Sequence, residues 1–247
     1  MTSSDLWDAE TAARYDEASA AMFAPAVLDP AVDLLAGLAG EGRALELAIG
    51  TGRVGIPLAQ RGVDVTGIEL SAPMVEQLHR RRPDLPVTVG DMATTRAQGE
   101  YALVYLVFNT IGNLCTQDEQ VACFANAARH LEPGGRFVVE VGVPALRRLP
   151  PGQAAVPFDV SEEHVGFDTY DPVTQRATSH HYSRQQDGSY RYAPHHFRYV
   201  WPGELDLMAR LAGMSLESRW SGWSREPFTA DSESHVSVWR KDRGAHR

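Results

Sequence analysis

The stretch from Ala44 to Gly55, ALELAIGTGRVG, constrains the fold of this chain more than any other part of it. An apolar run leads into Gly50 and Gly52, and glycine adopts backbone conformations that other residues avoid and lets a backbone approach a ligand closely. Residues 53–61 then follow a helical pattern. A strand, a tight turn and a helix N-terminus together present unpaired N–H groups to a polar or negatively charged ligand. The sequence therefore predicts a β–turn–α unit with a binding site at the turn.

Length and charge limit the class of protein. A chain of 247 residues with 43% hydrophobic residues can form one large α/β domain with its own core. A formal net charge of -9 argues against a broad contact surface for nucleic acid. The sequence has no apolar run near the ~18 residues of a membrane span, and its polar, acidic start does not resemble a secretory signal. We therefore expect a cytoplasmic protein with a small-molecule partner and no membrane or nucleic-acid partner.

Short apolar runs alternate with helical patterns through the first part of the chain, which is typical of a parallel sheet covered by helices. Residues 5–40 are expected to be mainly helical, with breaks at Pro25 and Pro30. The expected core strands are residues 44–48, 63–69, 87–89, 101–108, 136–141, 214–220 and 235–239, and a helix is expected at residues 203–212.

The composition changes at about residue 144, where prolines cluster before stretches rich in Thr, Tyr and His. Residues 165–170, 174–184 and 190–200 are expected to form antiparallel strands, with a hairpin turn at Asp187-Gly188. The expected domains are a helical N-terminal cover (1–40), a core (41–143 and 201–241) and an inserted β subdomain (144–200).

The ligand of the glycine turn is restricted by acidic residues. The sequence GTGRVG satisfies the dinucleotide pattern GxGxxG, so a dinucleotide is one candidate. However, Glu46, Glu69 and Asp91 lie in or at the ends of three successive predicted strands, which would bring them to one edge of a parallel sheet. Carboxylates do not favour an anionic pyrophosphate, but they accept hydrogen bonds from ammonium, ribose hydroxyl and adenine amino groups.

The motifs ELAIGTG, VTGIELS with Met74 following, VGDM and LEPGG occur in this order within residues 44–142. This series resembles the motifs of class I S-adenosylmethionine-dependent methyltransferases. The resemblance implies that Glu69 accepts hydrogen bonds from both ribose hydroxyls, that Leu70 and Met92 enclose the adenine, and that Asp91 accepts from its amino group. It also implies a cofactor site that includes Tyr15, Glu46, Ala48, Gly50, Gly52, Met74, Gly90 and Phe108. The family usually has glycine where this chain has Ala48.

The N-terminal segment WDAETAARYD is similar to the cover of small-molecule members of that family, which would place Trp7 and Tyr15 near the sulfonium or the acceptor. At the end of the fourth strand, FNTIGN offers Asn109 and Asn113, which either orient an acceptor or satisfy loop backbone groups. The chain has no (Asn/Asp)-Pro-Pro-aromatic motif there, which argues against methylation of nucleic-acid bases. Tyr199 belongs to a set of aromatic residues that would line an acceptor pocket or form the core of the insertion.

Histidines of the insertion are the candidates for a general base. They are His164, His180, His181, His195 and His196. Adjacent strand residues point to opposite faces, so at most one of each neighbouring pair should face the crevice. We take His181 and His196, together with Asn109, as the candidate catalytic residues. No metal site is expected, because no His/Asp/Glu set has ligand spacing.

The sequence thus predicts a Rossmann-like, doubly wound α/β fold with a mostly parallel seven-stranded sheet and an antiparallel β insertion, or lid, between strands five and six. The predicted function is N- or O-methylation of a small molecule by in-line transfer from S-adenosylmethionine. One alternative is an NAD(P)-dependent oxidoreductase, although the chain has no Tyr-x-x-x-Lys pattern. Another is a non-catalytic S-adenosylmethionine-binding protein. The sequence leaves open the acceptor, the oligomeric state and any movement of the lid.

Overall fold

A seven-stranded sheet forms the centre of the protein. The computed structural model describes residue 12 and residues 20–243. The strand order is β10-β11-β5-β4-β1-β2-β3. All pairs are parallel except those of β11, which runs antiparallel to both β5 and β10. The strands are β1 (Ala44–Leu47), β2 (Val65–Glu69), β3 (Val87–Val89), β4 (Tyr101–Leu106), β5 (Leu131–Gly142), β10 (Met214–Trp220) and β11 (Ser234–Lys241). The predicted doubly wound sheet is confirmed.

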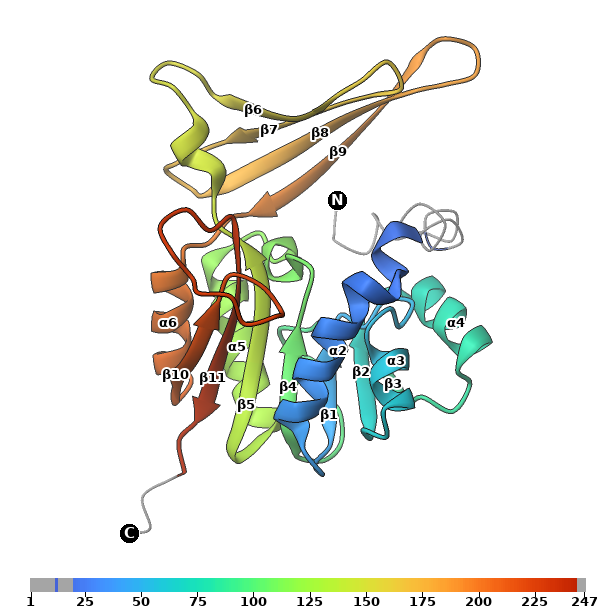
Figure 1. Ribbon diagram of the computed structural model, residues 1–247, viewed down its shortest axis with the longest axis vertical. Helices are drawn as coiled ribbons and strands as arrows, with labels where there is room; N and C mark the ends of the chain where they lie inside the picture. Colours follow the sequence, from blue (N-terminus) through green and yellow to red (C-terminus); the bar gives the residue numbers. More distant parts are fainter. Residues whose placement is uncertain (1–11, 13–19, 244–247) are drawn as a thin grey trace.

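Helices cover both faces of this sheet (Figure 1). Helices α5 (Gln117–His130) and α6 (Pro202–Leu211) pack on one face, around the buried rings of Phe124, Phe137 and Trp239. The opposite face is covered by α2 (Pro25–Ala39), α3 (Gly55–Gln60) and α4 (Ala72–Arg81). Short 3-10 turns lie at Ala20–Phe23, Thr110–Asn113 and Ala145–Arg148. Burial on both faces explains why the central strands are almost continuously apolar.

The insertion folds into a separate antiparallel sheet, which we call the lid sheet. It consists of β6 (Ala155–Val160), β7 (His164–Tyr170), β8 (Arg176–Arg184) and β9 (Tyr190–Arg198), in that order. Figure 1 shows the lid sheet above the edge of the larger sheet at which β1, β4 and β5 end. The strand β6 was not expected from the sequence because it contains Pro157, but it is an edge strand with a register shift at that residue, where proline is tolerated.

Other local differences have simple causes. Pro30 lies inside α2 and does not break it, and three neighbouring apolar residues of this helix, Val32, Leu34 and Leu35, are buried in the core. The strand expected at residues 136–141 begins earlier, because Pro133, Gly134 and Gly135 belong to β5, where its register against β4 shifts. In the described part of the chain, no helix is both long and apolar enough to cross a membrane.

Candidate functional site

A cavity of about 590 Å³ lies between the carboxyl ends of the core strands and the lid sheet. Its floor comes from the loops after β1, β2, β3 and β4, and its roof from the lid sheet and the segment that follows β9. The predicted site residues that line it are Ala48, Gly50, Glu69, Leu70, Met74, Gly90, Asp91, Met92, Phe108, Asn109, Asn113 and Tyr199. Motifs that are far apart in the sequence therefore share one enclosed space.

The glycine turn forms one wall. Ala48 and Gly50 line the cavity with φ values of 53° and 57°, so both have left-handed backbone. A Cβ at Gly50 would meet nothing within 4 Å, and its N–H donates to Glu69 Oε2 at 2.8 Å. Gly52 does not line the cavity; a Cβ there would lie 2.8 Å from the side chain of Ile56 in α3. Gly50 thus keeps the wall open, whereas Gly52 allows α3 to pack closely.

Glu46 lies behind this wall and does not line the cavity. It points to the α3 side of β1, is 2% exposed, and its Oε2 accepts a hydrogen bond from Tyr105 Oη at 2.9 Å. Burial raises the pKa of Glu46 to about 8, although hydrogen bonds from Tyr105 and from the backbone of Gly55 favour its charged form. These contacts tie β1, β4 and the start of α3 together beneath the glycine turn.

Glu69 presents a carboxylate to the cavity from the end of β2. Its Oε1 accepts from the Ser71 N–H at 2.8 Å, and its Oε2 accepts from Gly50. Burial raises its pKa, and these two backbone donors oppose that rise. A carboxylate can accept about four hydrogen bonds, so these backbone donors leave acceptor capacity for a ligand.

The loop after β3 is held by helix α5. Asp91 Oδ1 accepts from the Ala93 N–H at 2.6 Å, which shapes the turn. The fully buried Asn126 donates to the carbonyls of Met92 and Thr95, both at 2.9 Å. Asp91 and Met92 are therefore placed at the cavity by a side chain more than thirty residues later in the sequence.

The loop after β4 has unusual backbone. Phe108 and Asn109 adopt φ values of 60° and 59°. Glu140 at the end of β5 accepts from the Phe108 N–H at 2.8 Å and from the indole of Trp223 at 2.8 Å. Asn109 Oδ1 accepts from the Gly142 N–H at 2.6 Å. Left-handed residues other than glycine are uncommon and often occur at functional sites. Asn109 thus satisfies loop backbone while it lines the cavity.

The roof carries side chains that the sequence did not single out, among them Asp168, Tyr170 and Ser179. Alternation along β7 and β8 is the signal that would have found them, because residues two apart share a face. At the base of the roof, Arg198 is 3% exposed and donates to Gln120, Gln175 and Glu204 at 2.5, 2.6 and 2.9 Å. This buried network joins the end of β9 to α5 and α6.

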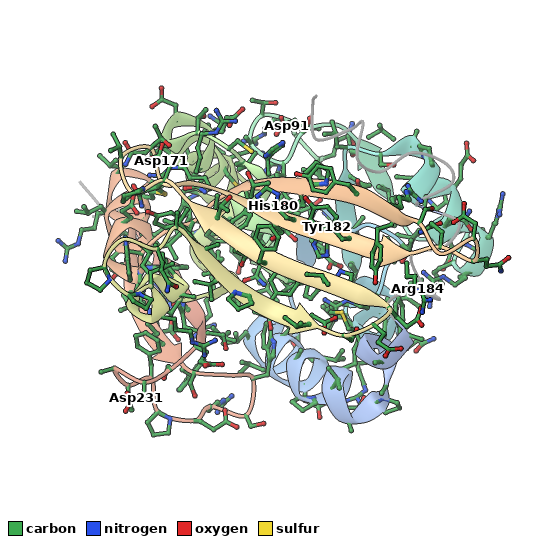
Figure 2. The ribbon with its side chains drawn as sticks, turned by 90° about the horizontal axis from the view of Figure 1, so that it is seen from above. Asp91, Asp171, His180, Tyr182, Arg184 and Asp231 are labelled. Atoms are coloured by element: carbon green, nitrogen blue, oxygen red, sulfur yellow. The ribbon has the colours of Figure 1, made fainter. Side chains whose placement is uncertain are left out.

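The two histidines chosen as candidate bases do not line the cavity. His196 lies on the outer face of the lid sheet, where its Nδ1 is bonded to Thr178 Oγ1 at 3.0 Å. Figure 2 looks down on this face, from which His180 and Tyr182 project. His181 is on the inner face but farther from the core, beside His164 at 3.1 Å. The histidine that reaches the cavity is His195. Trp7 and Tyr15 lie outside the described residues.

Comparisons with known proteins agree on one family. Residues 44–135 match the model of a methyltransferase domain. The chain is 37% identical to the CcbJ methyltransferase from Streptomyces caelestis, whose solved structure superposes with a TM-score of 0.77 over 86% of this chain and 88% of that one. It is 28% identical to a cypemycin N-terminal methyltransferase from a Streptomyces species, over 96% of this chain and 98% of the relative.

A further match covers a shorter part of the chain. The chain is 38% identical over 96 residues to the dTDP-3-amino-3,4,6-trideoxy-alpha-D-glucopyranose N,N-dimethyltransferase of Streptomyces venezuelae, which is 39% of this chain and 40% of that protein. The glycine turn and the strand ends that line the floor of the cavity fall within the domain match, whereas the lid sheet lies beyond it.

Proposed function

Because the chain is a class I S-adenosylmethionine-dependent methyltransferase, we propose that it transfers the methyl group to an amine nitrogen of a small molecule bound under the lid sheet. The family membership removes the NAD(P)-dependent oxidoreductase as an alternative, and the chain is an enzyme. Two relatives whose names state the acceptor position, the cypemycin and the amino-sugar enzymes, are both N-methyltransferases, which supports nitrogen as the acceptor atom.

The floor of the cavity fits S-adenosylmethionine. This molecule offers hydrogen-bond donors on its ribose, its adenine and its ammonium group, and the floor offers the carboxylates of Glu69 and Asp91 as acceptors. Leu70 and Met92 supply apolar surface on the same floor, and Gly50 leaves open space beside them. We assign these residues to the cofactor. Glu46, which lies behind the wall, would act by holding the glycine turn in place.

Charge in the cavity favours an amine as the acceptor. The roof adds the carboxylate of Asp168 to the acids of the floor. Of the lining residues that the structure describes, the basic ones are His195 and Arg198, and the Arg198 guanidinium is bound to Gln120, Gln175 and Glu204. A phosphorylated or carboxylated acceptor would therefore bring negative charge toward carboxylates without a free cation, whereas a protonated amine would be attracted. The Asp168 carboxylate in the roof is the observation that carries the proposal.

Methyl transfer at this site requires alignment of the acceptor nitrogen with the methyl group, and no covalent enzyme intermediate. S-adenosylmethionine supplies an activated methyl group, which a nitrogen lone pair attacks in line. The lid sheet lies above the strand ends, and the aromatic residues Phe197 of β9, Tyr199 just after it and Phe108 of the floor line the cavity. Fixing the reacting atoms and excluding water are contributions of the kind that accelerate such displacements.

A labelled-methyl assay tests the proposal. The purified enzyme is given matched acceptors with one carbon skeleton, such as 2-phenylethylamine, 2-phenylethanol and 3-phenylpropanoic acid, and then larger amines, amino-terminal peptides and their hydroxyl counterparts. We expect transfer to amines over the matched alcohols and acids. Transfer to a hydroxyl or a carboxylate in preference to the matched amine would overturn nitrogen as the acceptor.

Calorimetry checks the cofactor separately. S-adenosylhomocysteine should bind, and Asp91→Ala should weaken its binding, whereas NAD should not bind at all. Normal binding of S-adenosylhomocysteine to Asp91→Ala would remove that residue from the assignment.

A further inference from the structure

The inner face of the lid sheet carries a row of three polar residues over the cavity. Ser179 in β8 is paired with Asp168 in β7 and with His195 in β9, and all three line the cavity. Neighbouring strands are about 4.8 Å apart, so the backbones at Asp168 and His195 are separated by roughly 10 Å. A carboxylate and an imidazole that project from these positions leave room for one amine group between them.

The Asp168 carboxylate is held by two hydroxyl groups. Ser179 Oγ donates to its Oδ1 at 2.5 Å, and Tyr170 Oη donates to its Oδ2 at 3.1 Å. These donors fix the orientation of the carboxylate, and each oxygen retains a second acceptor position. A carboxylate held in this way is suited to bind an ammonium group through charge-assisted hydrogen bonds.

His195 differs from the other histidines of the lid sheet. His164, His180, His181 and His196 each have a side-chain hydrogen-bond partner. The imidazole of His195 has none among the described residues, although it lines the cavity. Burial lowers the pKa of His195, and the neighbouring His181 and His196 act in the same direction, while Asp168 opposes them. The lowered pKa favours the neutral imidazole, which has one ring nitrogen able to accept a proton.

We propose that Asp168 anchors the acceptor as a protonated amine and that His195 removes its proton before methyl transfer. This inference rests on the proposed function and names the groups that carry it out. A ring nitrogen of His195 takes one N–H proton, which leaves a neutral amine and an imidazolium. The nitrogen lone pair then forms the C–N bond while the C–S bond breaks with its electron pair on sulfur, so the sulfonium becomes a neutral thioether. The proton on His195 leaves to solvent, and the methylated product departs as an ammonium.

Both steps follow from general chemistry. A protonated amine has no lone pair and cannot attack, so an enzyme that attracts the cation must also remove a proton. The imidazole is placed across the row from the carboxylate that attracts the cation. The ionisable or charged groups around His195 in the described structure are Asp168 and Tyr170 of β7, His181 of β8, His196 and Arg198 of β9, and Glu69 and Asp91 of the floor.

Kinetics with the best amine from the acceptor screen test the base. We expect His195→Gln to lower kcat at pH 7 by about 100-fold, the lower part of the usual range for loss of an acid–base group. The wild-type kcat/KM should rise with pH and level off once His195 is neutral. The variant should continue to rise toward the pKa of the amine itself, because hydroxide and water then supply the free amine. His196→Gln, which changes the adjacent histidine on the outer face, is the matched control. It should keep the wild-type kcat and the plateau of the profile, and the midpoint of the rise should move only upward, because His196 no longer lowers the pKa of His195.

The anchor has a separate readout. Calorimetry measures the binding of 2-phenylethylamine and of 2-phenylethanol to the complex with S-adenosylhomocysteine. Asp168→Asn should weaken binding of the amine about 10-fold or more and leave binding of the alcohol unchanged. Ser179→Ala, a milder change that removes one donor to the carboxylate, should act in the same direction. Unchanged affinity for S-adenosylhomocysteine shows that each variant is folded.

The outcomes separate the two proposals. If no amine is methylated, the proposed function fails. If amines are methylated but His195→Gln has the rate and pH profile of His196→Gln, the base assignment is overturned. If Asp168→Asn binds the amine as the wild type does, or loses amine and alcohol equally, the anchor assignment is overturned.

Discussion

The buried Glu46 should make the stability of this enzyme depend on pH in a direction opposite to that of most acids. Burial raises its pKa from the ordinary 4.5 to about 8. Between these values the unfolded chain loses the proton while the folded protein keeps it, so stability falls as pH rises. At about 1.4 kcal/mol for each pH unit, the unfolding free energy falls by roughly 4 to 5 kcal/mol in all. The loss begins above pH 4.5 and is complete above pH 8.

The substitution Glu46→Gln isolates this effect, because the amide has nearly the same shape and no charge. Its oxygen can keep the hydrogen bond from Tyr105. Urea unfolding of both proteins at several pH values between 5 and 9 gives the difference in unfolding free energy, in which other titrating groups cancel. As pH rises across this range, the unfolding free energy of the variant should increase by several kcal/mol relative to that of the wild type. The difference should become constant near pH 8.

Tyr105→Phe serves as a second perturbation of the same carboxyl group. The hydroxyl of Tyr105 favours the charged form of Glu46, so its removal should raise the pKa further and move the levelling point above pH 8. A difference between Glu46→Gln and wild type that stays constant from pH 5 to 9 would refute the reasoning, since it would mean that Glu46 ionises in the folded protein as it does in the unfolded chain.

Four other changes address separate parts of the structure. Glu69→Ala should weaken S-adenosylhomocysteine binding by about 1.5 to 3 kcal/mol in calorimetry, the value for hydrogen bonds to a charged group, and unchanged affinity would mean that Glu69 is not a cofactor residue. Ala48→Gly should stabilise the protein in urea by about 0.5 to 1 kcal/mol, because it relieves a left-handed residue at φ 53°, and a loss of stability would contradict this account. Arg198→Met should cost about 3 to 5 kcal/mol in the same assay, since Glu204 would lose its charged partner, and a loss below 1 kcal/mol would show that the network does not fix the lid sheet. Burial lowers the pKa of His235 to about 4, so the unfolded chain binds the proton first and the unfolding free energy should fall by roughly 3 kcal/mol as pH falls from 6.5 to 4. His235→Gln should remove this fall from the plot of unfolding free energy against pH, and an unchanged fall would assign it to other groups.

The floor of the cavity follows from the sequence because strand order and strand ends are visible in it. Apolar runs identify the parallel strands, and the carboxyl ends of parallel strands meet at one edge. Glu69 and Asp91 therefore had to lie near the glycine turn, and both line the cavity. The strands of the lid sheet span residues 155–198, within the stretch after residue 144 whose composition differs from that of the core.

The roof could not be predicted at residue level. Alternation states that at most one histidine of each adjacent pair faces the cavity, but the choice depends on which face of the lid sheet turns to the core, and a shift of one residue reverses every side chain. His195 and His196 are distinguished only by that docking. His181 shares the inner face but pairs with Gly166 and Ala193, two positions farther along the strand from the row over the cavity. The distance of an inner-face residue from the cavity depends on how the lid sheet packs on the core, which the sequence of one strand does not show.

Glu46 shows a different limit. Its position before the glycines suggested a wall residue, yet β1 alternates, and Leu45 and Leu47 pack toward α5 while Glu46 takes the other face. The group that receives it, Tyr105, lies 59 residues later in the sequence. A pattern within one strand cannot reveal a partner on the neighbouring strand, so the side chain that supports the turn resembled one that contacts the ligand.

The floor and the roof of the cavity are both held in place by hydrogen bonds within the protein. The turn at Gly50, the left-handed Phe108 and the loop at Met92 are each held by a hydrogen bond to a buried or partly buried side chain, namely Glu69, Glu140 and Asn126. Each of these bonds joins a side chain to a backbone group, so the shape of the floor does not depend on a ligand. The roof is joined to the core through Arg198 and Glu204 at its base, and the row of Asp168, Ser179 and His195 extends from there. Because the floor is preorganised and the roof is held at its base, the entropy lost on binding comes mainly from the acceptor. Its amine must contact both Asp168 and His195 before the nitrogen is aligned for attack.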